Sequence, residues 1–495
     1  MEVELGAPNG IKWTQPLGLF INNEFVSSSE GKTIATINPT TEEEICAPHA
    51  ATASDVDKAV KAARAAFKHP SWKKLTGTER AVYLYRLADL IEKYGDVIAS
   101  IDALDNGKPF LGARGFDIPW GVNTLRYYAG WADKISGQTI DCGPEQMAYT
   151  IKTPVGVVGQ IIPWNLNTVF VGMKLGPALA CGNTVVLKTS ELCPLSVLFV
   201  AKLVKEAGFP PGVVNIINGY GPEAGAALAS HPDVDKISFT GSTATGKEIL
   251  RHAASNLKNV TLETGGKSPA IIFEDADLDN AALWTHSGVM LLSGQTCHAN
   301  SRVFVQEKIY DEFLEKYKAQ VSKVSVLGDP FEKTTFHGPQ VSKVQYEKVL
   351  GYIESAREEG ATIYMGGEPA PQGGRGFYVQ PTVFTNVKPG MKIYREEIFG
   401  PCVAVISFKT EEEALEMAND TTYGLSAAVF TSSVGRAHRV ASEFEAGMIY
   451  INSSNSPDFR VPFGGTKQSG TGRESGEEGL HPYFYTKSVY VNLTV

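Results

Sequence analysis

The chain has 495 residues, of which 43% are hydrophobic and 20% are charged, and its formal net charge at pH 7 is −9. This length accommodates two or three domains whose cores need no disulfide support, and the acidic balance gives no electrostatic reason to expect nucleic acid as a partner. No run of about 18 apolar residues occurs, which excludes an ordinary membrane-spanning helix and a membrane partner.

The cysteines and the N-terminus indicate the cellular compartment. The six cysteines, at positions 46, 142, 181, 193, 297 and 402, form no CxxC pair and no zinc-ligand spacing, so no metal site is predicted. Free thiols belong in a reducing compartment. The N-terminus lacks both an apolar core and an arginine-rich amphipathic pattern, so it signals neither secretion nor organelle import. We therefore expect a cytoplasmic protein.

The N-terminal part of the chain predicts short strands followed by helices. Residues 19–26 suggest a hairpin around Asn22 and Asn23. From Ser54, which can cap a helix, apolar residues such as Val56 and Val60 recur at helical spacing. A second helical region is expected over residues 80–103.

The middle of the chain predicts parallel sheets. Residues 155–262 alternate helical segments with apolar strands, expected at 157–162, 184–187, 213–217, 236–239 and 259–262. Strands joined in this way form a parallel sheet whose ligand lies at the strand carboxyl ends. A second α/β segment runs from about 268 to 470 and opens with a strand at 270–273.

Two segments fall outside this alternation. Residues 137–154 predict a hairpin, and residues 485–493 predict a last strand. Exposed strand edges of this kind invite pairing with another chain.

Three side chains stand where chemistry is expected. Cys297 lies among small and polar residues at 292–300, after the apolar segment 288–292. A thiol reacts as thiolate, which requires nearby donors or positive charge and a partly hydrated pocket, and we expect that setting here; the alternative is an ordinary buried cysteine. Glu263 and Asn165 each end a strand-like run. Together they suit a nucleophile, a general base and an oxyanion donor.

A nucleotide site is expected at residues 239–246, where a strand ends and a helix begins, because a helix N-terminus can face a pyrophosphate. The GxGxxG fingerprint is missing, since residues 219–225 hold one residue too many. Gly241, Gly246 and Lys247 nearly match a P-loop. Glu248 stands where a hydroxyl should bind magnesium and would repel a triphosphate, which disfavours a nucleotide hydrolase.

Seven motifs occur in one order along the chain: Pro163-Trp164-Asn165, Lys188-Thr189-Ser190-Glu191, Phe239-Thr240-Gly241-Ser242-Thr243-Ala244-Thr245-Gly246, the stretch around Glu263, Gly294-Gln295-Thr296-Cys297, Glu397-Ile398-Phe399-Gly400-Pro401 and Pro462-Phe463-Gly464-Gly465. In these motifs the sequence resembles the aldehyde dehydrogenase superfamily, from about residue 18 to the C-terminus. The resemblance implies an α/β fold with a Rossmann-like parallel-sheet cofactor domain (1–135 and 155–266), an α/β catalytic domain (267–470) and a small β oligomerisation segment (136–154 and 480–495). It further implies an active-site tunnel between the two larger domains and a homo-oligomer, either a tetramer or a dimer.

The resemblance also implies a reaction. Cys297 attacks an aldehyde, the side-chain amide of Asn165 and the Cys297 backbone N–H hold the oxyanion, and NAD accepts hydride. Glu263 then activates the water that hydrolyses the thioester. Lys174 and Glu474 are expected to relay a proton from Glu263 to solvent, although on pattern alone each is more often an ordinary salt-bridging residue.

The same similarity assigns cofactor residues. Lys188 and Glu191 are expected at the adenosine ribose, where Glu191 favours NAD over NADP, and Glu397 at the nicotinamide ribose. The alternatives are a surface pair for the first two and a solvated loop acid for Glu397. The full expected set is Ile161, Trp164, Lys188, Glu191, Gly221, Gly241, Ser242, Gly246, Gln345, Lys348, Glu397 and Phe399.

The substrate region departs from the family pattern. Leu166 and Asn167 replace a common aromatic residue and proline, Met173 stands where tryptophan is frequent, and the loop 453–460 is polar and carries Arg460. We expect a polar or acid-bearing aldehyde with Arg460 as a carboxylate clamp, the alternative being a solvent-facing Arg460. The expected substrate residues are Leu166, Asn167, Phe170, Met173, His298, Arg460 and Phe463. Thr264 stands beside Glu263 where leucine is usual in the family, and the sequence alone predicts no effect of this change.

Two rival functions are considered. A CoA-acylating relative would resolve the thioester with a thiol and would need no general base. A catalytically silent binding or structural protein on the same fold, as some lens proteins are, would be free to lose the nucleophile. Both Cys297 and Glu263 are present, which disfavours both rivals.

Overall fold

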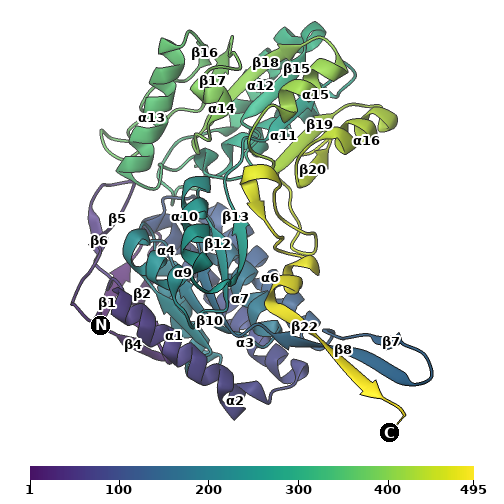
Figure 1. Ribbon diagram of the computed structural model, residues 1–495. Coiled ribbons are helices and arrows are strands. Elements are labelled where there is room, and N and C mark those ends of the chain that lie inside the picture. The colour runs from purple at the N-terminus through teal and green to yellow at the C-terminus, as the bar shows by residue number, and fades with distance from the viewer. Residues whose placement is uncertain (495) are drawn as a thin grey trace.

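A computed structural model describes residues 1–494, and its main body is built on two large sheets (Figure 1). The first sheet has eight strands in the order β21-β13-β12-β9-β10-β11-β3-β4. The strands are β3 (Leu19–Ile21), β4 (Glu24–Val26), β9 (Val157–Ile161), β10 (Thr184–Lys188), β11 (Val214–Ile217), β12 (Lys236–Thr240), β13 (Asn259–Glu263) and β21 (Gly470–Thr471). The five strands β9 to β13 run parallel, while β3 and β21 pair antiparallel to the sheet. The predicted parallel sheet and the 19–26 hairpin are confirmed.

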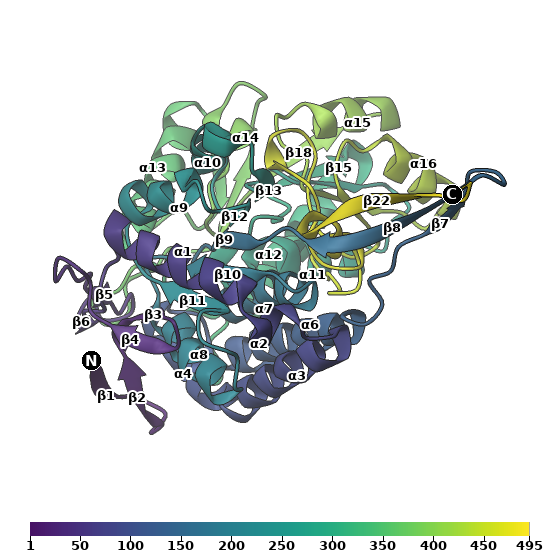
Figure 2. The ribbon, with the colours of Figure 1, turned by 60° about the horizontal axis from the view of Figure 1, so that its bottom comes forward.

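Helices cover both faces of this sheet (Figure 2). Val158, Leu187 and Ile216 pack into one core with α3, α4, α6, α7 and α8, while Val157 and Val186 pack into another with α1, α9 and α10. These helices are α1 (Ala53–Lys68), α3 (Gly77–Lys93), α4 (Gly95–Asp105), α6 (Ile118–Trp131), α7 (Asn167–Ala180), α8 (Leu195–Glu206), α9 (Ala226–Ser230) and α10 (Thr243–Ala253). Alternate side chains of a strand point to opposite faces, so the continuous apolar runs fit strands covered on both sides.

Two helix expectations need correction. The first helix begins at Ala53 with Thr52 as N-cap, and not with Ser54, because the Asp55 carboxylate accepts the Thr52 N–H at 3.1 Å. The region 80–103 forms two helices, α3 and α4, which are separated at Tyr94. Short elements complete the N-terminal part: β1 (Glu2–Gly6), β2 (Lys12–Pro16), β5 (Thr36–Ile37), β6 (Glu44–Cys46), α2 (Pro70–Lys73) and α5 (Phe110–Gly112).

The second sheet has seven strands in the order β16-β17-β18-β15-β14-β19-β20, and all neighbours except β16 and β17 run parallel. The strands are β14 (Pro269–Ile272), β15 (Arg302–Gln306), β16 (Thr362–Met365), β17 (Thr382–Thr385), β18 (Cys402–Phe408), β19 (Ser426–Phe430) and β20 (Met448–Ile451). The helices here are α11 (Leu278–Met290), α12 (Tyr310–Val324), α13 (Lys343–Glu358), α14 (Lys392–Arg395), α15 (Glu411–Asn419) and α16 (Val434–Glu443).

A third sheet projects from the body as a ribbon that carries the C-terminal strand (Figures 1 and 2). It joins β7 (Thr139–Asp141), β8 (Gln146–Pro154) and β22 (Phe484–Asn492), all antiparallel. The predicted hairpin and last strand are thus present, and β8 and β22 pair over their whole length. Within residues 1–494, no helix combines the length and the apolar character needed to cross a bilayer.

Candidate active site

The carboxyl ends of the strands β9, β10, β12 and β13 meet at one edge of the first sheet. Lys188 pairs with Ile161, and Thr240 pairs with Glu263, so these four residues end neighbouring strands. The chain leaves β9 through Pro163-Trp164-Asn165 and enters α7. Parallel strands place ligand-binding groups at this edge.

A sharp turn after α11 delivers the thiol to this edge from the second sheet. Leu292 and Ser293 adopt left-handed backbone conformations with φ of 53° and 56°, and Gly294 follows at φ 74°. A Cβ at Gly294 would lie 2.0 Å from the Gly400 carbonyl oxygen, so only glycine fits. The Asn165 amide donates to the Gln295 carbonyl at 3.0 Å, which places that amide beside the loop of Cys297.

The thiol, the carboxylate and the amide share one cavity, which we call the main cavity and whose empty space, its open mouth included, is about 660 Å³. It is lined by Pro163, Trp164, Asn165, Phe170, Thr240, Gly241, Ser242, Glu263, Thr264, Gly265, Cys297, Gln345, Lys348, Glu397 and Phe399. These residues come from the segments that carry both large sheets. Such an arrangement suits a nucleophile and a base that act on one bound molecule.

Glu263 is buried, and neither of its carboxylate oxygens has a hydrogen-bond partner among residues 1–494. Burial raises its pKa well above the ordinary value, and the like charge of Glu474 raises it further. Lys174 is fully buried, pairs with Glu474 and donates to Ser238 at 2.9 Å. No hydrogen bond of the described chain joins Glu263 to this pair, so the expected relay is an electrostatic contact here and not a connected chain.

The setting of Cys297 differs from the expected thiolate-stabilising one. Burial raises the pKa of the thiol, and the nearby charges of Glu397 and Glu263 raise it further. The backbone hydrogen bonds of Cys297 and His298 lower the pKa of the thiol, but they do not outweigh burial and the two carboxylates. The thiol is therefore the resting form, and a proton acceptor is needed when it reacts.

The main cavity offers the groups that a dinucleotide requires. Ser242 caps α10 and accepts the Thr245 N–H at 3.2 Å, which leaves the helix N-terminus at the cavity edge. The hydroxyl of Thr240 is buried without a hydrogen-bond partner among the described residues. Gln345 donates to the Phe399 carbonyl at 2.8 Å. An unpaired hydroxyl and a capped helix N-terminus fit a phosphorylated cofactor.

Glu397 is held firmly against the backbone that follows β13. Its carboxylate accepts the Gly266 N–H at 3.0 Å, and a Cβ at Gly265 would lie 2.3 Å from Glu397 Oε2. Burial raises the pKa of Glu397 to about 7, which Lys348 and Lys267 oppose. A solvated loop acid would show none of these contacts, so that alternative is wrong.

The remaining expected cofactor residues lie outside the lining of the main cavity: Ile161, Lys188, Glu191, Gly221 and Gly246. Lys188 is buried at the end of β10, where burial lowers its pKa, and its Nζ lies 3.4 Å from the Glu191 carboxylate. This excludes an ordinary surface pair. A Cβ at Gly246 would lie 2.9 Å from the Thr264 methyl group, so Thr264 supports α10 closely.

Comparison with known proteins decides the family. The aldehyde dehydrogenase family profile matches residues 25–489. An aldehyde dehydrogenase from Alternaria alternata is 51% identical over 492 residues, which cover 99% of this chain and 98% of that protein. The NAD+ complex of an aldehyde dehydrogenase from Bacillus cereus is 50% identical with a TM-score of 0.94 and covers 97% of both chains. A betaine aldehyde dehydrogenase from Staphylococcus aureus, solved with NAD+, is 39% identical with a TM-score of 0.95 and covers 97% of this chain and 95% of that one.

The chain belongs to the aldehyde dehydrogenase family. Its resemblance in seven motifs and its expected α/β fold are thereby confirmed.

Beside Cys297, the chain has a second pocket, which we call the side pocket and whose empty space, its open mouth included, is about 560 Å³. Its lining residues are Phe116, Trp120, Leu166, Val169, Phe170, Met173, Leu291, Leu292, Thr296, Cys297, His298, Asn455, Pro457 and Phe463. Of the seven expected substrate residues, Leu166, Phe170, Met173, His298 and Phe463 are brought together here. Most of the lining is aromatic or aliphatic, which goes against the expectation of a polar or acid-bearing aldehyde.

Two expected substrate residues lie elsewhere. Asn167 turns away from the side pocket and donates to Asp102 at 3.1 Å and to Ser196 at 3.0 Å, so it ties α7 to α4 and α8. Arg460 is exposed and pairs with Asp458 at 2.6 Å. The carboxylate clamp is therefore wrong, because Arg460 finds its partner two residues away on the surface.

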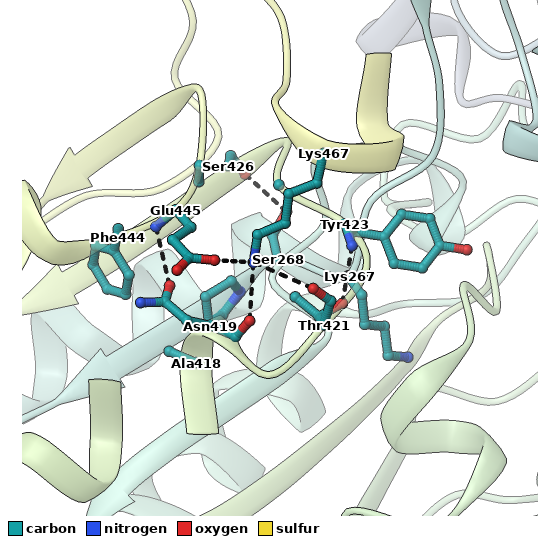
Figure 3. Close-up of a pocket in the computed structure, with 13 residues that line it drawn as sticks. Lys267, Ser268, Ala418, Asn419, Thr421, Tyr423, Ser426, Phe444, Glu445 and Lys467 are labelled. Carbon is teal, nitrogen blue, oxygen red and sulfur yellow. Dashed lines mark hydrogen bonds and ion pairs between the residues drawn. The ribbon is translucent and has the colours of Figure 1, made fainter. Parts of the chain in front are cut away.

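A third, smaller pocket is lined by residues that include Ser268, Asn419 and Lys467 (Figure 3). Lys467 pairs with Glu445 and donates to the carbonyls of Asn419 and Thr421 at 3.0 and 3.3 Å. The Lys267 side chain, seen in the same view, leads away from this polar group (Figure 3). Because the polar atoms around Lys467 form hydrogen bonds and an ion pair with one another, this pocket is a structural junction of the fold.

Sequence reasoning missed several residues that shape the active site. Phe116 enters the side pocket from the π-helical turn Ala113–Asp117, and Trp120 enters it from the start of α6. Lys108 donates to the Asn165 carbonyl at 2.8 Å and pairs with Asp117. The spacing of Phe116 and Trp120, four residues apart, is the signal of a shared helix face. No signal in the sequence points from Lys108 to Asn165.

Proposed function

We propose that this enzyme oxidises an aldehyde to the carboxylic acid with NAD as hydride acceptor, with Cys297 as the nucleophile and Glu263 as the general base. The observation that carries the proposal is that Cys297, Glu263, Asn165 and Glu397 line one cavity. The family and its NAD-bound relative support the chemistry.

NAD would lie along the main cavity, and when bound it supplies the acceptor for the hydride. The N-terminus of α10, with Ser242 and Gly241, would face the pyrophosphate. Glu397, Gln345, Lys348 and Phe399 would surround the nicotinamide half, with Trp164 on the opposite wall. Ile161, Lys188, Glu191, Gly221 and Gly246 would hold the adenosine half, where the Glu191 carboxylate would repel a 2′-phosphate.

The chain's own groups carry the covalent steps. The Cys297 sulfur attacks the aldehyde carbon, and the oxyanion is stabilised by the Asn165 amide and the Cys297 backbone N–H. The Asn165 amide already lies 3.0 Å from the Gln295 carbonyl, two residues before the nucleophile. After hydride loss a thioester remains, and Glu263 removes a proton from the water that hydrolyses it. Burial raises the pKa of Glu263 most, the negative charge of Glu474 raises it further, and the positive charge of Lys174 lowers it.

The substrate class follows from the side pocket. Its walls, among them Phe116, Trp120, Phe170 and Phe463, favour an aldehyde with an aromatic or long hydrocarbon group. Each methylene buried there contributes about 0.8 kcal/mol to binding. A carboxylated substrate would find no cation among the residues that line this pocket.

We also propose the division into a cofactor domain (1–135 and 155–266), a catalytic domain (267–470) and an oligomerisation segment (136–154 and 480–495). The projecting sheet of β7, β8 and β22 supports the last of these, because it exposes strand edges away from the body. A homotetramer is the proposed assembly, with a dimer as the alternative.

The proposal is tested by NADH absorbance with a panel of aldehydes and with NAD and NADP side by side. We expect turnover with NAD, highest for apolar aldehydes, and none after Cys297→Ala. A silent protein would form no NADH, and a CoA-acylating enzyme would require CoA and release an acyl-CoA. Turnover by the Cys297→Ala enzyme would refute the thiol mechanism.

A further inference from the structure

The residue that follows the nucleophile contacts its sulfur. His298 Nδ1 lies 3.7 Å from Cys297 Sγ, within hydrogen-bond range for sulfur. Among residues 1–494, this imidazole is the only side chain that forms a hydrogen bond with the thiol. Glu263, the other base at hand, makes no hydrogen bond with the sulfur.

The imidazole is held in place on the wall of the side pocket. His298 is 5% exposed, and its ring meets the Phe463 ring edge-on at 5.8 Å and 88°. The Ser426 hydroxyl donates to the His298 carbonyl at 3.2 Å, and Phe463 pairs with Glu474 through the backbone. A ring fixed in this way keeps Nδ1 aimed at the sulfur.

Both partners are uncharged at rest. Burial lowers the pKa of His298 to about 4, so at neutral pH one ring nitrogen carries a free lone pair. The other titratable groups that act on Cys297 are Glu397, Glu263 and Tyr450, none of which is a cation. With a thiol that is half-buried in the cavity and no cation among the groups that act on it, a preformed thiolate is unfavourable. Proton removal must therefore accompany the attack.

We propose that His298 Nδ1 accepts the Cys297 thiol proton as the sulfur attacks the aldehyde. In this step the Sγ–H bond breaks, the Sγ–C bond forms, the carbonyl π electrons move onto oxygen, and the proton ends on Nδ1. The imidazolium then returns the proton to water, since its burial disfavours the charge. The inference rests on the proposed role of Cys297 as nucleophile, and it makes His298 a catalytic residue that acts before Glu263.

The test measures alkylation of Cys297 by iodoacetamide from pH 5.5 to 8.5, with the modified peptide identified by mass spectrometry. In the wild-type enzyme the rate constant should be nearly independent of pH, because the pair transfers its proton across the whole range. In His298→Gln, which keeps a polar side chain without a basic nitrogen, only free thiolate reacts. Its rate should rise about tenfold per pH unit and at pH 6 should be slower on the order of 100-fold.

His286→Gln is the matched control. His286 is also buried, its pKa is also lowered to about 4 by burial, and its Nε2 lies 2.8 Å from the Ser325 hydroxyl, outside both cavities. Its alkylation profile should match that of the wild type. Thermal melting checks folding, and His298→Asn replaces His298→Gln if the latter does not fold.

The proposal is overturned if the His298→Gln variant, or His298→Asn in its place, keeps an alkylation rate that is independent of pH. It is also overturned if Glu263→Gln is the only variant whose alkylation rate becomes dependent on pH. In that case the role of Cys297 still stands, provided that Cys297→Ala forms no NADH. If Cys297→Ala does form NADH, the proposed function itself fails.

Discussion

Replacing Lys108 by methionine tests how the fold positions Asn165. The Lys108 ammonium is buried, pairs with the buried Asp117 and donates to the Asn165 carbonyl at 2.8 Å. Removing one partner of a buried ion pair leaves an uncompensated charge and costs about 3–5 kcal/mol. With an unfolding entropy of about 2.1 cal/mol/K per residue, a chain of 495 residues that unfolds as one unit should melt about 3–5 °C lower. Because Asn165 loses its anchor, kcat should fall on the order of tenfold to a hundredfold.

The loss of stability should depend on pH in a defined direction. Burial raises the pKa of Asp117 to about 6 although Lys108 lowers it, and without Lys108 the pKa should rise further. A carboxyl group with a raised folded-state pKa binds more protons in the folded state, so stability falls as pH rises from about 4 through that pKa. The melting deficit of Lys108→Met should thus be larger at pH 8 than at pH 5, by differential scanning calorimetry.

Lys134→Met is the control for this prediction, because Lys134 pairs with Asp133 on the surface at 2.7 Å and its removal should shift the melting temperature by less than about 1 °C. A Lys108→Met enzyme that melts like the wild type would refute the reasoning. So would a deficit that is greater at pH 5.

Three further outcomes are expected. Gly265→Ala should raise the KM for NAD on the order of tenfold with little change in the KM for aldehyde, because the new Cβ would lie 2.3 Å from Glu397 Oε2; equal effects on both KM values would count against it. Arg460→Ala should change kcat/KM by less than about twofold for matched neutral and carboxylated aldehydes, because Arg460 pairs with Asp458 outside the side pocket. A fall in kcat/KM for the carboxylated aldehyde alone would instead support Arg460 as a carboxylate-binding residue. Glu191→Gln should raise kcat/KM with NADP relative to NAD about tenfold, because a negative charge near the 2′-phosphate is removed; an unchanged ratio would separate Glu191 from cofactor choice.

Much of the fold was predictable because it depends on local patterns. The strands β9 to β13 are short, apolar and separated by helical segments, and this pattern predicts a parallel sheet with the carboxyl ends of its strands together. Glu263 and Asn165 were therefore expected at one edge. The N-cap of α1 was predicted two residues too late, at Ser54, because the Asp55 carboxylate accepts the Thr52 N–H and so makes Thr52 the cap.

The side pocket was not predictable because its walls come from segments far apart. Asn167 sits at the first turn of α7, and only the packing of α4 and α8 decides that it faces Asp102 and not the substrate. The position of the Arg460 side chain is determined by its hydrogen bond to Asp458 in the same loop. Phe116 and Trp120 approach Leu166 from about 50 residues earlier, and no periodicity in the sequence records that contact.

The most direct test of the mechanism is the mass of the enzyme during a single turnover. Glu263→Gln enzyme mixed with NAD and an apolar aldehyde should form about one NADH per active site and then stall, because hydrolysis loses its base and slows by about 100- to 10,000-fold. Acid quenching followed by peptide mass spectrometry should find the acyl group on Cys297 alone. NADH formation without an acylated Cys297, or with the acyl group on another residue, would contradict the account.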